Sequence, residues 1–292
     1  MQASTRRCTA CAAPNGLEAR FCRTCGTMLP PVIPDAAPVA VAAPVDVSVG
    51  DAAVLPGEAA APEPLPGEAV APPEPLDGHA VGEQAWREVQ GVAWLFLTLI
   101  SVSVAGFIAL KAGAEEAPVD VVMTVIGAVA VLACVVAARG TVAPLLGTGV
   151  GWRGGLAAVG SFAGLLAFGS VYFSALEALG FPLIRMTDTF LAAGWEPWAI
   201  YVLISLCPAV FEELAFRGYM MAKLEGLLTA TEVLLVQAAL FSVLHFGVAI
   251  FPSHFVIGVV LGLLRQRTGS LYPSMAVHAA WNAYVVWSEL HP

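Results

Sequence analysis

Long apolar runs dominate the chain after residue 90, and they constrain its fold more than any other feature. A helix needs about 20 apolar residues to cross the hydrocarbon core of a bilayer. Candidate runs follow one another along this part of the chain, and the sixth is short. They are residues 91–110, 119–138, 155–179, 199–223, 231–250, 254–264 with its flanks, and 271–289. The sequence therefore predicts an all-α, multi-pass transmembrane helical bundle of about seven spans.

The composition supports a membrane protein and argues against other classes. Hydrophobic residues make up 58% of the 292 residues, charged residues only 12%, and the mean hydropathy is +0.80. A soluble protein of this size would have to expose large apolar patches to reach such values. The net charge is −9, but much of the acidity falls in residues 35–83, a stretch without Lys or Arg. No basic surface remains that would suit nucleic acid, so the lipid bilayer is the expected partner.

The distribution of Lys and Arg predicts the orientation of the bundle. Cytoplasmic loops near the spans are enriched in these residues. If the N-terminus is cytoplasmic, only Lys111 and Arg185, among the Lys and Arg residues near the spans, lie on the outer side of the membrane. The residues that fall inside are Arg87, Arg139, Arg153, Lys223, Arg265 and Arg267. Because the first thirty residues also lack the apolar stretch of a signal peptide, we expect a multi-pass protein of the cell (inner) membrane with its N-terminus in the cytoplasm.

Two pairs of cysteines near the N-terminus predict a zinc site. Cys8 and Cys11 form one Cys-x2-Cys pair, and Cys22 and Cys25 form the second. This arrangement places four thiolates around a tetrahedral Zn²⁺, whereas two disulfides are disfavoured in a reducing compartment. Residues 1–29 resemble the short zinc ribbons at the N-termini of many prokaryotic membrane proteins. Since four thiolates leave no open coordination position, the zinc is expected to be structural, and the ribbon is a candidate for binding a cytosolic protein.

A segment rich in proline and alanine separates this ribbon from the apolar runs. Residues 30–84 contain a repeated motif, "LPGEAAAPEP" and "LPGEAVAPPEP", and many acidic residues. Proline prevents regular hydrogen bonding, and the apolar side chains are too small to form a core. We therefore expect a disordered acidic linker, with a docking motif for a partner domain as the alternative. Residues 85–292 then form the transmembrane domain.

Several polar residues lie inside the apolar runs. The fourth run contains Glu212, Glu213 and Arg217, the fifth contains His245, and the seventh contains His278 and Asn282. An ionisable group at the centre of a bilayer costs a few kcal/mol even on lenient scales. Each residue also has a structural interpretation. Glu213 and Arg217, four residues apart, could neutralise each other as an ion pair, and a single histidine in a helix is more often a packing residue.

The depths of these residues favour a shared site. Counted from the cytoplasmic end of each run at about 1.5 Å per residue, the depths are about 16 Å for Glu212, 21 Å for His245, 10 Å for His278 and 16 Å for Asn282. Packing residues on separate helices would have no reason to share one level of the membrane. His278 and Asn282 also point the same way, since they stand at i and i+4. We therefore expect one buried polar site built by three helices.

The residue types in this site indicate hydrolysis by water. A carboxylate beside an imidazole can remove a proton from a water molecule. A second histidine and an asparagine are suitable donors to a developing oxyanion. Ser242 and Ser274 lie near these residues in the sequence, but neither has a helical phase that would place it beside a base. The expected reaction is hydrolysis of an amide bond within the membrane.

Three motifs carry a resemblance to a known family. "EELAFR" (212–217), "FSVLH" (241–245) and "HAAWN" (278–282) match EExxxR, FxxxH and HxxxN. These are the motifs of the CPBP family, which includes CAAX prenyl proteases and Abi or bacteriocin-processing proteins, and the resemblance covers residues 195–290. It implies a helical intramembrane endopeptidase acting on a peptide or membrane-protein substrate.

The resemblance also implies roles for the motif residues. Glu212 would be the general base with His245 as its partner on the attacking water, and His278 and Asn282 would form the oxyanion hole. Glu213 and Arg217 would hold the site in shape. The family has been described both as metalloproteases and as glutamate-dependent enzymes, and Glu, two His and Asn could ligate Zn²⁺. HExxH is absent and the ligand set is poor in nitrogen, which favours the glutamate type. His254 belongs to no motif and is expected at the membrane interface, with a neighbour of the site as the alternative.

Two other functions compete with a protease. A non-catalytic immunity or scaffold protein would keep the polar residues for stability, and an ion-coupled transporter would use them as an ion path. The transporter is disfavoured because the two halves show no inverted repeat of broken helices. The glycine pairs Gly160/Gly164 and Gly258/Gly262 are expected to permit close packing of helices.

Overall fold

The structure is a computed structural model that describes residues 5–7, 14–16, 78–147, 149–182 and 185–291. The chain divides into two compact units, residues 1–81 and 82–292. In the first unit, strands β1 (Thr5–Arg7) and β2 (Pro14–Gly16) pair antiparallel, with Arg6 opposite Asn15. The four expected zinc ligands, and residues 30–77 of the expected linker, lie outside the described residues, so the ribbon and its zinc stay predictions.

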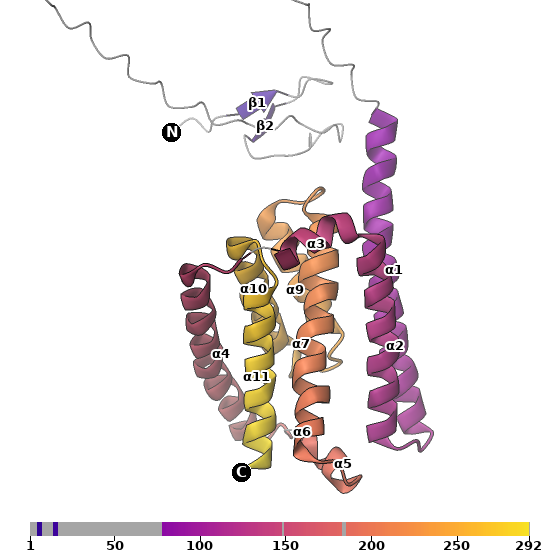
Figure 1. The fold of residues 1–292 in the computed structure, drawn as a ribbon, viewed down its shortest axis with the longest axis vertical. Helices are drawn as coiled ribbons and strands as arrows, with labels where there is room; N and C mark the ends of the chain where they lie inside the picture. Colours follow the sequence, from indigo (N-terminus) through magenta and orange to yellow (C-terminus); the bar gives the residue numbers. More distant parts are fainter. Residues whose placement is uncertain (1–4, 8–13, 17–77, 148, 183–184, 292) are drawn as a thin grey trace, which may run out of the picture. The chain divides into compact units, whose positions relative to one another are not determined.

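The second unit is helical (Figure 1). Its helices before the site are α1 (Gly78–Lys111), α2 (Glu116–Ala137), α3 (Arg139–Gly147), α4 (Trp152–Ala178) and α5 (Thr187–Ala192). α1 begins within the expected linker, because "GHAVGEQ" (78–84) contains no proline that would interrupt a helix.

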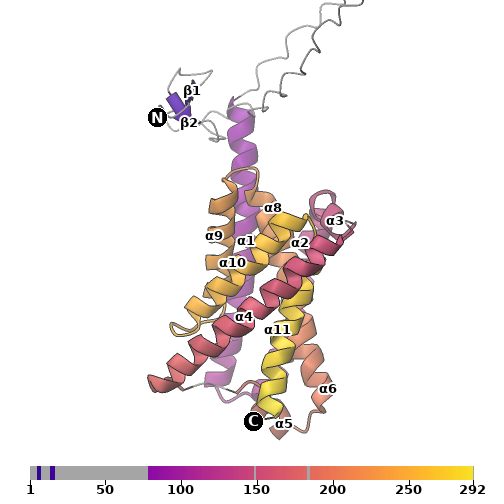
Figure 2. The same ribbon diagram turned by 90° about the vertical axis from the view of Figure 1, so that its left-hand side faces the viewer.

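A composite helix, Pro197–Leu224, follows and leads to the three last helices. It consists of α6 (Pro197–Ile200), the π-helical segment η1 (Tyr201–Leu206), α7 (Cys207–Glu212), the π-helical segment η2 (Glu213–Met220) and α8 (Met221–Leu224). The last helices are α9 (Ala230–Val243), α10 (Phe251–Thr268) and α11 (Tyr272–Leu290). The composite helix packs against α2, α3, α9, α10 and α11, while α4 crosses α10 and α11 obliquely (Figure 2).

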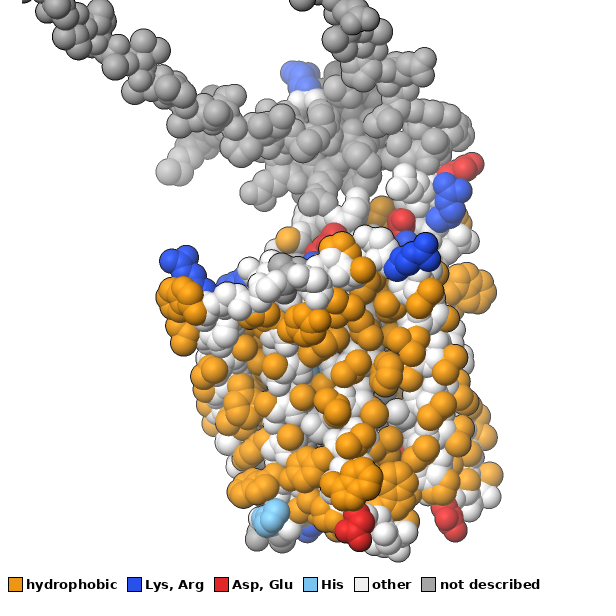
Figure 3. All heavy atoms as spheres, in the orientation of Figure 1, with side chains coloured by type: hydrophobic (Ala, Val, Ile, Leu, Met, Phe, Trp, Pro, Cys, Tyr) orange, Lys and Arg blue, Asp and Glu red, His pale blue; other side chains and the backbone are white. Residues whose placement is uncertain are grey.

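Helices suited to cross a membrane confirm the multi-pass class. Within the described residues, 4 helices are long and apolar enough: Gly82–Lys111, Glu116–Ala137, Trp152–Ala178 and Pro197–Leu224. Hydrophobic side chains cover much of the face shown in Figure 3, with charged groups near its two ends. All seven expected runs overlap helices, but the fifth is shorter than expected, since α9 ends at Val243 and a turn with φ 45° at Phe246 follows. A count of seven spans stays a prediction.

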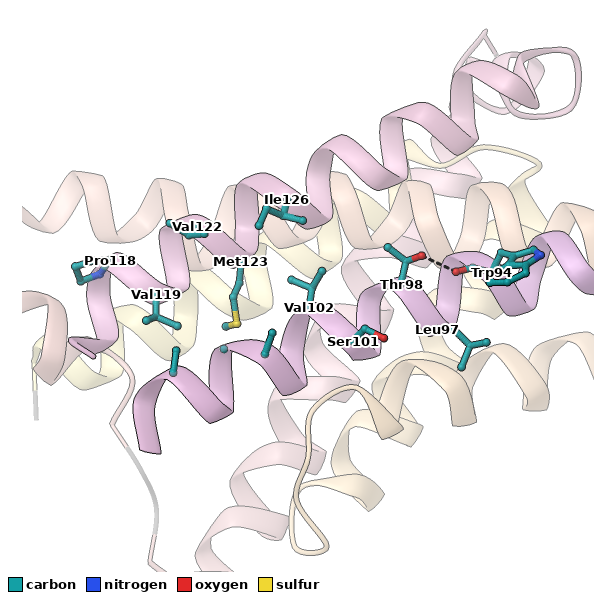
Figure 4. A pocket seen from close by; sticks show the side chains of 13 residues that line it. Trp94, Leu97, Thr98, Ser101, Val102, Pro118, Val119, Val122, Met123 and Ile126 are labelled. Atoms are coloured by element: carbon teal, nitrogen blue, oxygen red, sulfur yellow. Dashed lines mark hydrogen bonds between the residues drawn. The ribbon is translucent and has the colours of Figure 1, made fainter. Parts of the chain in front are cut away.

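A cavity of about 660 Å³ lies between α1 and α2 (Figure 4). Trp94, Leu97, Val102, Met123 and Ile126 are among the residues that line it. No acidic, basic or histidine side chain takes part in this lining. The cavity is therefore an apolar feature separate from the polar residues of the motifs.

Close packing of α9 on α10 depends on Gly258. A Cβ atom at this position would lie 2.9 Å from the Cα and the Cβ of Ala238. The prediction that glycine permits close packing of helices is confirmed at Gly258 but is wrong for Gly160 and Gly164. A Cβ at either of these positions would meet nothing within 4 Å, because both line a groove of about 460 Å³ between α4 and α10. α4 instead approaches α11 at Gly169, where a Cβ would lie 2.3 Å from the ring of Trp281.

This difference predicts unequal effects of two alanine substitutions. Gly258→Ala forces the α9 and α10 backbones apart and is expected to lower the free energy of unfolding by about 1–3 kcal/mol. Gly160→Ala adds a methyl group to open space and removes backbone freedom from the unfolded chain, so its stability should be unchanged or slightly higher. Thermal unfolding of the purified protein in detergent measures both. Equal unfolding midpoints for the two variants would contradict this account of the packing.

Candidate active site

The composite helix is irregular at the point where α11 packs on it. Pro208 has no backbone N–H, so it cannot donate to the Ile204 carbonyl four residues earlier. Asn282 Nδ2 donates to this oxygen instead, at 3.2 Å. In the opposite direction, Ser205 Oγ donates to the Ala279 carbonyl at 2.8 Å. These two hydrogen bonds attach α11 to η1 and fix which face of α11 is turned to the composite helix.

Glu213 and Arg217 form a fully buried ion pair. Arg217 Nη1 lies 2.8 Å from Glu213 Oε1, and both side chains are 0% exposed. Arg217 Nη2 also donates to the Gly258 carbonyl of α10 at 3.2 Å, and Gln237 Nε2 of α9 donates to the same oxygen at 2.8 Å. The ion pair that the spacing of Glu213 and Arg217 predicted is therefore present. The pair also joins the composite helix to α9 and α10.

His278 lies between the two adjacent glutamates. Its Nδ1 is 3.0 Å from Glu213 Oε1, and its Nε2 is 3.8 Å from Glu212 Oε2. The His278 side chain is 4% exposed, whereas Glu212 is 34% exposed. Glu212 Oε2 is buried and has no hydrogen-bond partner among the described residues. Glu213 Oε2 is likewise buried without such a partner. The two glutamates thus differ in charge balance and exposure: Glu213 is neutralised by Arg217 and enclosed, and Glu212 is partly exposed.

Phe241 of α9 is the common neighbour of the other groups. The guanidinium of Arg217 lies 4.5 Å from its ring centroid. The centroids of His245, His254 and His278 lie 4.8, 6.0 and 6.0 Å away. Imidazoles from α11, from α10 and from the turn after α9 therefore surround one phenyl ring. This ring excludes water from Arg217 on one side and borders the imidazoles on the other.

The structure brings four of the six sequence-predicted residues together and gives the other two different partners. Glu212, Glu213, Arg217 and His278 are in direct contact or within ion-pair distance. His245 reaches the group through Phe241, and Asn282 bonds the backbone of η1. Both serines considered as nucleophiles donate to backbone carbonyls, Ser242 to Phe251 and Ser274 to Leu271.

Two further residues lie beside the site. For His254 the structure supports the alternative, a neighbour of the site, since its ring lies on that of His245 with centroids 3.8 Å apart. Gln237, fully buried, carries no prediction, although it stands four residues before Phe241 on one face of α9. An amide in the middle of an apolar helix was the signal that could have found it. The contact of His254 with His245 depends on the turn between α9 and α10, so no local sequence pattern predicts it.

The side chains that could ligate a metal ion at the site have other partners. Among the described residues, no three His, Cys, Asp or Glu side chains gather in a way that could hold one. Glu212, His245, His278 and Asn282 were the candidate ligands. Both ring nitrogens of His278 face carboxylates, and Asn282 is bonded to a backbone carbonyl.

Geometry and sequence comparison agree on the class of this domain. It is a helical membrane domain with a buried carboxylate–imidazole site contributed by the composite helix, by α11 and by the turn after α9. Residues 194–284 match the family model described as "Type II CAAX prenyl endopeptidase Rce1-like", and this range contains all three motifs. No curated protein and no solved structure matched the chain. Residues 194–284 are therefore similar to Rce1-like domains, and the match covers less than half of the chain.

The buried ion pair predicts a stability pattern for its variants. Arg217→Met leaves the Glu213 carboxylate buried without its cation and is expected to lower the free energy of unfolding by about 3–5 kcal/mol. The double variant Glu213→Gln/Arg217→Met removes both charges and should recover part of this loss. Thermal unfolding in detergent completes the double-mutant cycle. Glu212→Gln is the matched control, since this side chain is accessible, and it should unfold within about 1 kcal/mol of the wild type.

Additive losses in the cycle would show that Glu213 and Arg217 do not depend on each other. A Glu212→Gln variant as unstable as Arg217→Met would contradict the different environments of the two glutamates.

Proposed function

We propose that this chain is an intramembrane endopeptidase that hydrolyses a peptide bond of a membrane-associated peptide or protein, using water activated by Glu212 and His245. The observation that carries the proposal is the different state of two adjacent carboxylates. Glu213 is bound to Arg217 and His278 and is 0% exposed, while Glu212 is 34% exposed and lies 3.8 Å from His278 Nε2.

Glu212 is the candidate general base. A base must reach water and must not already be neutralised by a fixed cation. Glu212 meets both conditions, as it is partly exposed and lies 3.8 Å from His278 Nε2, a separation that leaves its carboxylate free to hold a water molecule. Glu213 meets neither condition. Its role is to hold His278 and Arg217 in place.

His245 is suited to orient the attacking water. Its Nδ1 lies 2.9 Å from the Phe241 carbonyl oxygen, which can only accept a hydrogen bond. Nδ1 therefore carries the proton, and Nε2 keeps its lone pair. A ring in this tautomer accepts a hydrogen bond from water at Nε2. Glu212 and His245 would then each accept one hydrogen of the same water molecule and leave its oxygen lone pair directed at the substrate.

His278 and Asn282 are the proposed oxyanion donors. His278 donates from Nδ1 to Glu213, and when its Nε2 is also protonated, that N–H can donate to the oxygen of a tetrahedral intermediate. Asn282 uses one N–H on the Ile204 carbonyl and has a second.

The proposed reaction balances without any further group. Glu212 takes one proton of the water as its oxygen bonds to the carbonyl carbon, and the carbonyl oxygen becomes the oxyanion. Collapse of this intermediate breaks the C–N bond. The proton held by Glu212 passes to the leaving amine, which restores the carboxylate.

The family supports a substrate of CAAX type, a prenylated cysteine followed by a short C-terminal tail. The motif positions and the apolar helices support cleavage at the membrane. The excess of Lys and Arg on one side supports a cytoplasmic N-terminus in the inner membrane, and the Cys8/Cys11 and Cys22/Cys25 pairs support a structural Zn²⁺ ribbon that binds a cytosolic protein.

Glu212→Gln tests the proposed base. The full-length protein, reconstituted in liposomes, is assayed with an internally quenched farnesylated CAAX peptide. Glu212→Gln should lower kcat by about 10²–10⁴-fold, because an amide cannot take the proton. In parallel, new protein termini are compared in membranes of cells that express either protein, which covers other substrates. Glu177→Gln, at an exposed acid near the end of α4, is the matched control and should behave as the wild type.

Termini that depend on wild-type Glu212 but not on Glu177 support a protease. If Glu212→Gln cleaves the peptide as fast as the wild type, or if neither assay detects cleavage that depends on Glu212, the proposed function is wrong.

A further inference from the structure

His254 stacks on His245, although it belongs to none of the three motifs. The ring centroids are 3.8 Å apart, and the ring planes are inclined by 32°. The turn between α9 and α10 brings the two histidines together. At this separation, neither ring can rotate about its side-chain bonds without displacing the other, since close-packed neighbours leave no free volume for the motion.

His245 needs such a restraint because it lies beyond the end of α9. The next residue, Phe246, has a φ of 45°, a left-handed conformation that is unfavourable for a phenylalanine. Tyr172 of α4 holds the turn by donating to the Ala249 carbonyl at 2.6 Å. This hydrogen bond fixes the backbone but does not touch the imidazole. The ring of His245 is left with the Phe241 carbonyl at one edge and with neighbouring rings at its faces.

His254 is itself held firmly enough to serve as a fixed surface. It stands in the first turn of α10, and its Nδ1 lies 3.1 Å from the Ile250 carbonyl oxygen. Ser253 donates to the same carbonyl at 2.8 Å. Because a carbonyl only accepts, the His254 proton also sits on Nδ1. The two rings meet face to face rather than edge to edge, so stacking and not a hydrogen bond between them is the interaction that His254 supplies.

We infer that His254 is a positioning residue that holds the ring of His245 by stacking and so keeps its Nε2 directed at the water that Glu212 activates. This inference rests on the proposed function and deepens it. His254 exchanges no proton in the reaction. Any flat ring of similar size at this position should do the same work, and a small side chain should not.

The inference predicts opposite outcomes for two substitutions. His254→Ala removes the stacked ring and should lower kcat by about tenfold, the size of a lost aromatic pair expressed as a rate. KM should stay within about twofold, since substrate binding does not use this ring. His254→Phe keeps a flat ring and should restore kcat to near the wild-type value. The assay uses the full-length protein in liposomes and the farnesylated CAAX peptide.

Phe255→Ala is the matched control. Phe255 is the next residue of α10, and its ring stacks on Phe251, with centroids 6.1 Å apart, rather than on a histidine. It should leave kcat unchanged. An unaffected His254→Ala would overturn the inference, and so would a His254→Phe variant as slow as His254→Ala, because the nitrogen atoms and not the stack would then matter.

A spectroscopic measurement decides the inference even without activity. The chain contains 5 histidines, so ¹⁵N-histidine labelling gives a small set of ring signals, and His245 is assigned by their loss in His245→Asn. In the wild type and in His254→Phe, His245 should show one set of signals with the proton on Nδ1. In His254→Ala, both tautomers should be populated. Unchanged His245 signals in His254→Ala would refute positioning by His254, whereas absence of cleavage in the wild type would refute the proposed function alone.

Discussion

The ion pair between Glu213 and Arg217 is the interaction on which the rest of the site depends. A charge enclosed in an apolar helix bundle must be neutralised nearby, because moving it from water costs far more than any single contact returns. Arg217 meets this need for Glu213 and donates its second Nη to the Gly258 carbonyl. That contact is possible because α10 lies close to α9 at a residue without a side chain. One ion pair thereby sets the spacing of three helices, on which Phe241 and the imidazoles are then placed.

Neutralising one glutamate leaves its neighbour available for chemistry. Glu212 and Glu213 are adjacent in sequence, so they point in directions about 100° apart around the helix. One direction leads into the core and to Arg217, and the other leads to a partly exposed position beside His278. The two adjacent glutamates of the motif, Glu212 and Glu213, thus have different roles. In the proposed function the first glutamate is the base, and the second organises the groups around it.

Much of this site could be predicted from local sequence spacing, and the exceptions have a common cause. The i to i+4 spacing of Glu213 and Arg217, and of His278 and Asn282, follows from helix geometry alone. The stack of His254 on His245 depends on where α9 stops and how the chain turns at Phe246, and neither is encoded by periodicity. The partner of Asn282 was missed because Pro208 was not considered as a source of a free carbonyl. Counting residues along each span predicted that the polar side chains lie at a similar depth in the membrane. It could not predict their partners, because these are set by packing between helices.

The hydrogen bonds between α11 and η1 explain how His278 reaches its place. A shift of α11 by one residue would rotate its side chains by about 100° and turn His278 away from both glutamates. Ser205 and Asn282 oppose this rotation, since their bonds to Ala279 and Ile204 can form together in one register only. Pro208 cannot donate to the Ile204 carbonyl, one of the two acceptors, because it has no backbone N–H. An irregular turn of the composite helix is therefore part of the site: it exchanges one backbone hydrogen bond for a fixed orientation of the helix that carries His278.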